Sequence, residues 1–193
     1  MTMFDRADAA TWLTTVWAAG DNTPFAVVDV ETTGLSSATD RVIELAIVRC
    51  DVHGEVVDEW SCLFDPARDP GPTHIHGITA DDLAGAPTFA DRAPEVLERL
   101  AGHTVVAHNL GFDSGFLDAE IARAGLAPAP LTGLCTLELA RLLLPDQRRH
   151  TLAECAATFS IEHVSAHRAL PDTLVTAAVL QRLLALAPPR PLF

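Results

Sequence analysis

The chain has 193 residues, of which 49% are apolar and 20% charged, and its formal net charge is −13. This composition is that of a globular protein rather than a disordered one, and the length suits a single domain over residues 1–193. The acidic balance argues against a broad surface for duplex phosphates, because that affinity needs clustered Lys and Arg, but it leaves room for an enzyme whose carboxylates hold divalent cations.

Secretion and a membrane partner are not expected. The N-terminus carries Asp5 and Asp8 where a signal peptide needs positive charge. No apolar run reaches the length expected of a membrane span. The four cysteines lie far apart without a C-x-x-C pair, which favours reduced thiols and a cytoplasmic location.

The first predicted elements are a helix and three strands. Trp12, Leu13, Val16 and Trp17 recur at helical spacing. This pattern predicts a helix over about 8–19, inside an N-terminal helical extension over 1–22, with both tryptophans in the core. Strands are predicted over 24–31, 41–51 and 54–64, the last two joined as a hairpin.

Strands and helices then alternate along the chain. A loop rich in Pro and Gly, 65–79, precedes a helix with Thr88 as its cap and Gly102 at its end. Strands near 103–109 and 131–136 lead into helices over 110–125, 137–144, 151–159 and 169–186, before a Pro-rich tail, 187–193. The order predicts an α/β fold with a mixed central sheet of about five strands, an antiparallel hairpin plus parallel strands, covered by helices on both faces.

Four acids and one histidine fall at the ends of these elements. Asp29 and Glu31 end the first strand, where residues two apart point to the same side. Asp113 and Asp172 lie in the first turns of two helices, and His167 precedes Asp172 by five residues. Each acid alone also fits a solvated carboxylate or a helix-dipole partner. Together they make a set suited to hard divalent cations, since Mg²⁺ takes oxygen ligands.

Three segments carry a family resemblance: "VVDVETTGL" from residue 27, "VVAHNLGFDSGFL" from 105 and "HRALPD" from 167. They resemble the motifs of the DEDDh 3′–5′ exonucleases, a family with an RNase H-like fold that includes the proofreading subunit of bacterial replicative polymerases. The resemblance implies that Asp29, Glu31, Asp113 and Asp172 bind two divalent metal ions, Mg²⁺ with Mn²⁺ able to substitute. It also implies that His167 is the general base, a role for a neutral imidazole.

Residues around the acids are expected to bind substrate. Gly34 permits a tight turn after Thr32 and Thr33, and in similar enzymes this segment contacts the terminal nucleotide. His76 lies in "HIHGIT", which resembles the segment flanking the same pocket. His74 and His76 equally fit ordinary loop histidines or a weak metal pair.

Two further candidates lie in the second motif. Asn109 is expected to cap the following helix through its side chain and, by resemblance, to line the substrate groove. Phe112 fits either a ring that stacks on a base or a core residue. Cys135 stands where the family pattern usually places an acid, so any supporting role of that acid is absent.

The function favoured by this reading is a 3′–5′ exonuclease, nearest to the proofreading group, that releases nucleoside 5′-monophosphates from single-stranded or frayed 3′ ends, with DNA favoured over RNA. Three alternatives stay open: an RNA-processing exoribonuclease, a phosphodiesterase acting on small nucleotides, and a non-catalytic module that binds a polymerase or nucleic acid. The terminal "RPLF" is similar to sliding-clamp-binding peptides but also fits a frayed tail, so a polymerase or clamp partner is open too. "RPLF" and "DQRRH" (146–150) are locally basic, yet no larger Lys/Arg cluster stands out.

Overall fold

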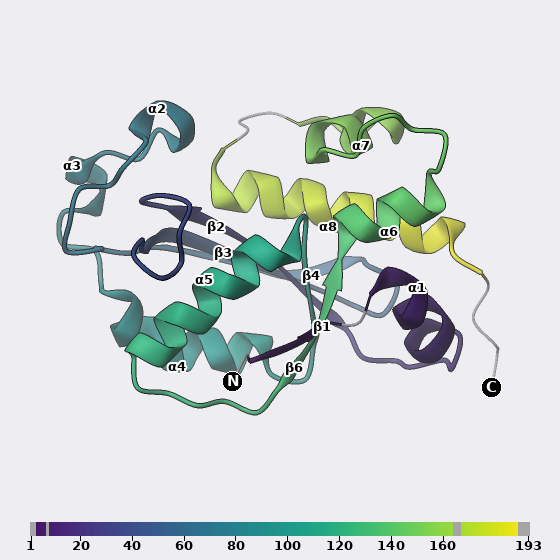
Figure 1. Cartoon of the computed structure of the whole chain (residues 1–193), viewed down its shortest axis with the longest axis horizontal. Coiled ribbons are helices and arrows are strands. Elements are labelled where there is room, and N and C mark those ends of the chain that lie inside the picture. The colour runs from purple at the N-terminus through teal and green to yellow at the C-terminus, as the bar shows by residue number, and fades with distance from the viewer. Residues whose placement is uncertain (1–2, 7, 164–166, 189–193) are drawn as a thin grey trace.

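The structure, a computed structural model, describes residues 3–6, 8–163 and 167–188. These residues form a six-stranded sheet in the order β1-β6-β5-β2-β3-β4 (Figure 1). The strands β1, β6, β5 and β2 run parallel, and β3 and β4 form an antiparallel hairpin beside β2. Their bounds are β1 Phe4–Arg6, β2 Phe25–Thr32, β3 Val42–Cys50, β4 Val56–Leu63, β5 Thr104–Ala107 and β6 Leu131–Cys135. The predicted mixed α/β sheet is confirmed, with six strands instead of about five.

The central strands are buried on both faces. β2 begins with the buried run "FAVV", and seven of the nine residues of β3 are buried before Arg49. Strands covered on two faces read as nearly continuous apolar runs rich in Val and Ile, because neither face meets water. This explains why the sequence shows apolar runs here rather than strict alternation.

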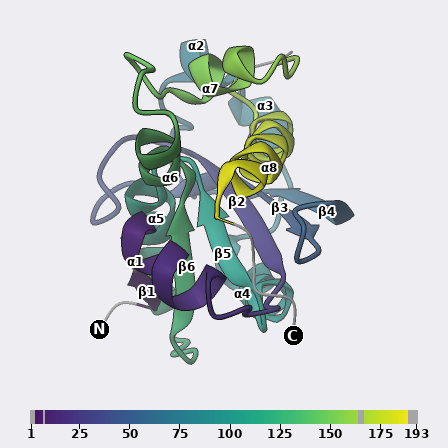
Figure 2. The same ribbon diagram turned by 90° about the vertical axis from the view of Figure 1, so that its right-hand side faces the viewer.

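Helices cover both faces of the sheet. One face carries α1 (Ala9–Trp12), the π-helical turn η1 (Leu13–Trp17), α6 (Thr136–Leu143), α7 (Leu152–Thr158) and α8 (Ala169–Leu186). The other carries α4 (Phe89–Leu100) and α5 (Leu110–Arg123). In Figures 1 and 2, α7 and α8 lie above the strands and α4 below them. Two short helices, α2 (Thr73–His76) and α3 (Ala80–Leu83), follow β4, and Leu83 of α3 packs with Ile43 of β3.

The alternation of β2 divides its side chains between these two layers. Phe25 and Val27 belong to the core beneath α8, whereas Val28 and Val30 belong to the core beneath α4 and α5. Because side chains alternate along a strand, Asp29 and Glu31 continue the row that faces α8. The register of the sheet therefore directs the first two acids toward the last helix.

Helix α8 is the apolar centre of its layer. Over 18 residues its mean hydropathy is 1.3, so by length and composition it could cross a membrane, and no such run was expected from the sequence. Half of this helix is buried inside the domain, where Val179, Leu180 and Leu183 are fully covered. Packing on the sheet accounts for its apolar composition.

The N-terminal segment differs from the expected helix. The range predicted as one helix is α1 followed by the π-helical turn η1, and a short strand, β1, precedes them. The Thr14 hydroxyl donates to the Ala10 carbonyl and the Thr15 hydroxyl to the Thr11 carbonyl, bonds that compete with the α-helical ladder and often bend helices. Trp12 and Trp17 are buried 5.7 Å apart between ring centroids, so their predicted core role is confirmed.

The cysteines and the C-terminal tail complete the comparison. The four cysteines form no disulfide among the described residues; Cys50 and Cys155 are buried, as expected of all four, whereas Cys62 and Cys135 are partly exposed. The "RPLF" segment, 190–193, lies outside the described residues.

Candidate active site

Asp29 and Glu31 lie on the part of β2 that extends past its parallel neighbour. β5 pairs with β2 only over Phe25–Val27, so the edge of β2 beyond Val27 is not covered by a strand on that side. On the other side Asp29 and Glu31 pair with Ala46 and Glu44 of β3. The two carboxylates thus stand at an open carboxyl edge of the sheet, where α/β proteins commonly bind ligands.

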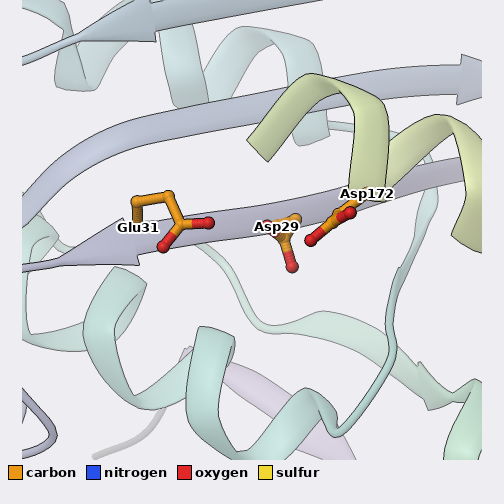
Figure 3. A group of neighbouring side chains, drawn as sticks. All are labelled: Asp29, Glu31 and Asp172. Carbon is orange, nitrogen blue, oxygen red and sulfur yellow. The ribbon is translucent and has the colours of Figure 1, made fainter. Parts of the chain in front are cut away.

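Asp172 reaches the same place from the first turn of α8. Ligand oxygens of Asp29, Glu31 and Asp172 all lie within 4.8 Å of one another (Figure 3). Figure 3 shows the three carboxylates converging from β2 and from the start of α8. Three carboxylates at this separation can share divalent cations through oxygen ligands alone, the donor set that Mg²⁺ and Mn²⁺ prefer.

Asp113 approaches from the opposite face of the sheet. It lies in the first turn of α5, is 3% exposed, and accepts a hydrogen bond from the Val30 N–H at 3.2 Å. That N–H belongs to the uncovered edge of β2, so the missing strand partner is replaced by the carboxylate. Asp113 therefore bonds to the strand backbone between the two acids of β2, although it is not one of the three acids whose ligand oxygens lie within 4.8 Å of one another.

Asp29, Glu31 and Asp113 sit where ionisation is costly. Burial raises the pKa of Asp29 well above its ordinary value, and the charges of Asp113, Glu31 and Asp172 raise it further. Burial, then Glu44 and Asp172, raises the pKa of Glu31 to about 7. Burial likewise raises the pKa of Asp113 to about 8, although backbone hydrogen bonds oppose the shift. Without a cation, the cluster holds protons near neutral pH.

His167 and Asp172 are joined through the backbone. The His167 N–H donates to Asp172 Oδ2 at 3.0 Å, while the His167 imidazole is exposed and φ of this residue is 69°. The ring that contacts Asp172 belongs to His163, whose Nε2 lies 2.6 Å from Oδ1. The sequence reading did not single out His163.

An ion pair between a buried glutamate and an exposed arginine also went unnoticed in the sequence. Glu44, 4% exposed, accepts from the Arg168 Nε at 3.1 Å and Nη2 at 2.9 Å, and from the Ala169 N–H at 3.0 Å. This bidentate contact ties the start of α8 to β3 beside Glu31. A lone acid inside the apolar run of 42–48 was the signal that could have identified Glu44.

The turn after β2 is held by its own side chains. The Thr32 hydroxyl donates to the Gly34 carbonyl at 2.6 Å, and the Thr33 hydroxyl accepts from the Arg41 N–H at 3.1 Å. A Cβ on Gly34 would lie 2.5 Å from Asp40 Oδ2. Gly34 is therefore needed for the close approach of Asp40. Thr32 and Thr33 themselves are buried.

His76 lies in the short helix α2 rather than in a loop. It is 3% exposed, and its Nδ1 accepts from the Ile78 N–H at 3.0 Å, which places the proton of a neutral ring on Nε2. That buried Nε2 forms no hydrogen bond within the part of the chain that the structure describes. His74 is exposed, and neither histidine belongs to a metal-type cluster among the described residues.

Asn109 occupies the N-cap position of α5 without a side-chain cap. The prediction of a side-chain cap is wrong, because Asn109 adopts a left-handed conformation with φ 75° and its backbone carbonyl accepts from the Phe112 N–H instead. Phe112 is half-buried and packs against Phe116, with the ring centroids 4.9 Å apart and the rings tilted by 49°. Its core contact is confirmed.

Comparison with known proteins agrees with this geometry. A family model described as Exonuclease, RNase_T, matches residues 26–180. The chain belongs to this exonuclease family. The predicted DEDDh-type relationship and the enzyme class, a nuclease of the hydrolase type, are thereby confirmed.

The relatives are much longer proteins. DNA polymerase III PolC-type of Bacillus cereus is 39% identical over 162 residues, which cover 83% of this chain and 11% of the polymerase. The Bacillus subtilis protein of the same name is 38% identical over 165 residues, again 83% of this chain and 11% of that protein. This exonuclease-family chain thus spans about a tenth of the length of the curated relatives it matches.

Solved exonuclease structures share the fold. Exonuclease X in complex with 5′ overhanging duplex DNA is 29% identical, with a TM-score of 0.65, over 83% of this chain and 91% of that one. E. coli exonuclease I in complex with a dT13 oligonucleotide has a TM-score of 0.74 at 21% identity, over 83% of this chain and 41% of that one. The predicted RNase H-like architecture is confirmed.

Proposed function

We propose that this chain is a metal-dependent 3′–5′ exonuclease that hydrolyses phosphodiester bonds at a single-stranded or frayed 3′ end of DNA and releases nucleoside 5′-monophosphates. One observation carries the proposal: Asp29, Glu31 and Asp172 place ligand oxygens within 4.8 Å of one another. In the described part of the chain, no arginine forms an ion pair with any of these three acids. Like charges so placed need cations to ionise together.

Divalent metal ions fit this donor set. With Asp113, the acids would hold two ions, Mg²⁺ with Mn²⁺ as a substitute, which supply Lewis-acid activation of water and stabilisation of the leaving 3′ oxygen. His167, exposed just before α8, would accept the proton of the attacking water as general base. The contact of its backbone N–H with Asp172 keeps this residue beside the acids.

The residues around the acids would orient the terminal nucleotide. The turn over Thr32, Thr33 and Gly34 follows the two acids of β2 directly, and the Nε2–H of His76 is a donor that would suit a substrate oxygen. Phe112 keeps part of its ring exposed at the start of α5, next to Asn109, where a base could stack.

The relatives support DNA as the substrate. The PolC-type relatives are DNA polymerases, and the exonuclease X and exonuclease I structures hold DNA. A proofreading role next to a polymerase follows from this similarity, and a sliding-clamp partner is the further proposal that the "RPLF" segment suggests.

The test uses 5′-labelled DNA and RNA oligonucleotides, single- and double-stranded, incubated with Mg²⁺, Mn²⁺ or chelator. We expect a ladder of shortened single-stranded DNA that keeps its label and disappears with chelator. Asp29→Ala and Asp172→Ala should each lower the rate by about a thousandfold or more, because they remove cation ligands. Circular dichroism checks that both variants fold.

Three results would overturn the proposal. They are full activity of either variant, cleavage that persists in chelator, and processing from the 5′ end. A preference for RNA would reassign the substrate to the exoribonuclease alternative, and hydrolysis confined to the nitrophenyl ester of thymidine 5′-monophosphate would support the small-nucleotide phosphodiesterase.

A further inference from the structure

The positive charge of this acidic protein is unevenly neutralised. All 13 of its Lys and Arg positions are arginines. Most of those described form ion pairs with acids, namely Arg41, Arg49, Arg68, Arg92, Arg99, Arg123 and Arg168. Within the described residues, Arg141, Arg148, Arg149 and Arg182 form no ion pair.

Three of these arginines line one hollow. Arg141 on α6 and Arg148 and Arg149 on the connection between α6 and α7 surround a volume of about 580 Å³. All three are exposed, and the residues that line the hollow with them include no carboxylate. Its volume is within the range of small-ligand sites, roughly 300–1,000 Å³. Three uncompensated guanidinium groups around one concave surface attract anions.

The connection that carries Arg148 and Arg149 is held in place by hydrogen bonds. His108, at the end of β5, bonds through Nε2 to the His150 carbonyl at 2.8 Å. The His150 ring bonds back to the Leu144 carbonyl at 3.0 Å, and the Gln147 amide donates to the Arg149 carbonyl at 2.6 Å. Burial lowers the pKa of His108, which favours the neutral ring that bonds to the His150 carbonyl. The arginines are therefore presented on an ordered backbone, which reduces the entropy cost of binding.

The hollow lies at the same end of the sheet as the acidic cluster. Asn109 lines it and stands one helical turn before Asp113. His108 and Asn109 follow β5, at the same carboxyl edge of the parallel strands at which β2 carries its acids. In Figure 2, α7 and the connection from α6 lie together at the top of the molecule, above α6. An adjoining hollow shares Asn109, Leu137 and Arg141 but is also lined by Asp8 and Glu138, which disfavour an anion there.

We propose that the hollow lined by Arg141, Arg148 and Arg149 binds backbone phosphates of the nucleic-acid strand upstream of the scissile bond. The proposal rests on the exonuclease function proposed above. A strand whose 3′ end enters the acidic cluster needs an attractive contact, because the net charge of −13 repels a polyanion. Guanidinium groups bind phosphate in a bidentate way without reading the base, which suits an enzyme that removes any nucleotide.

The test compares oligo-dT substrates of about three and about twelve nucleotides, with kcat/KM measured for each over a range of salt concentrations. In the double variant Arg148→Gln/Arg149→Gln, the ratio of kcat/KM for the longer substrate to that for the shorter one should fall about tenfold. Adding Arg141→Gln to this variant should lower the ratio further. The slope of log kcat/KM against log salt for the longer substrate should become shallower by about 0.7 for each arginine removed, the value for one single-strand phosphate contact. Arg182→Gln is the matched control, since Arg182 is an exposed, unpaired arginine of α8 outside this hollow.

Hydrolysis of the nitrophenyl ester of thymidine 5′-monophosphate separates this proposal from the proposed function. Failure of the wild-type protein to hydrolyse the ester and the oligonucleotides of both lengths would overturn the exonuclease proposal and the phosphate site with it. Metal-dependent cleavage with an unchanged length preference and salt slope in the arginine variants would overturn the phosphate site alone. So would an effect of Arg182→Gln equal to that of the double variant. Thermal unfolding of each variant identifies any loss that comes from misfolding.

Discussion

Asp172 shows how one side chain can organise two histidines. Its Oδ1 contacts the His163 ring at 2.6 Å, and its Oδ2 accepts from the His167 backbone N–H at 3.0 Å. A carboxylate that binds a cation can keep such contacts, because its two oxygens offer about four lone pairs and metal-binding carboxylates are commonly hydrogen-bonded as well. The His163 ring is thus engaged with Asp172, while the His167 ring is exposed and, under the proposed function, would accept a proton.

Exchange of the two histidines for alanine distinguishes these roles. We expect His167→Ala to lower kcat by about 10²–10⁴-fold, the usual contribution of a general base. His163→Ala should change kcat less than about tenfold, because its contact is not part of the proton transfer. Both rates are measured on a labelled single-stranded oligonucleotide in saturating Mg²⁺. The opposite ranking of the two variants would assign the base role to His163.

At the scale of elements, the turn after β2 depends on a glycine from a distant loop. Gly71 precedes α2 with φ +86°, and a Cβ there would lie 2.2 Å from the Thr33 carbonyl oxygen. The loop before α2 therefore packs directly against the backbone of the turn that follows Asp29 and Glu31. Gly85 has a similar φ, +80°, but nothing lies within 4 Å of its Cβ position.

Gly71→Ala and Gly85→Ala both introduce strain in a left-handed backbone, but only Gly71→Ala also places a Cβ against neighbouring atoms, so the difference between the two variants measures the crowding. Both substitutions carry the cost of a left-handed residue with a side chain, about 1–2 kcal/mol. Gly71→Ala must also displace the turn, so we expect its Tm to fall several degrees below that of Gly85→Ala, and its kcat/KM to fall at least about tenfold. Thermal unfolding and steady-state cleavage measure the two effects. Equal values in the two variants would show that the packing of Gly71 on Thr33 does not matter.

At the scale of the whole molecule, the acidic cluster couples folding to protons and cations. Burial raises the pKa of Glu31 to about 7 and of Asp113 to about 8, above the ordinary carboxyl range. At pH values between the ordinary carboxyl pKa of the unfolded chain and these raised pKa values, the folded protein therefore binds more protons than the unfolded chain. The stability that Glu31 and Asp113 contribute is present at low pH and is lost as the pH rises through about 7 and about 8. A cation that binds only the folded state offsets this loss.

This linkage predicts a pH-dependent effect of metal on stability. Without metal, Tm should fall as pH rises from about 6 to 9, and Mg²⁺ should raise Tm more at pH 8–9 than at about pH 6, where it competes with bound protons. Asp113→Asn should flatten the metal-free profile, since it removes one of the raised carboxyls. Differential scanning calorimetry with and without chelator measures the profiles. A metal-free Tm that rises over this range, or a Mg²⁺ effect that is independent of pH, contradicts the assignment.

The sequence by itself determined most of the elements and the identity of the acids. The buried runs of β2, β3 and β5, the Thr88 cap of α4 and the bounds of α8 all follow from local periodicity and capping, which depend on residues close in the chain. Asp29 and Glu31 share a side for the same local reason, the two-residue repeat of a strand.

Only the tertiary structure decided how distant groups meet. Asp113 bonds to the Val30 N–H because β5 pairs with β2 only as far as Val27, which leaves that N–H without a strand partner. Glu44 pairs with Arg168, which lies 124 positions later in the sequence. Arg141 joins Arg148 and Arg149 only because His108 holds the α6–α7 connection against the end of β5. Such contacts depend on where each strand ends and how the layers pack, and local spacing does not encode either quantity.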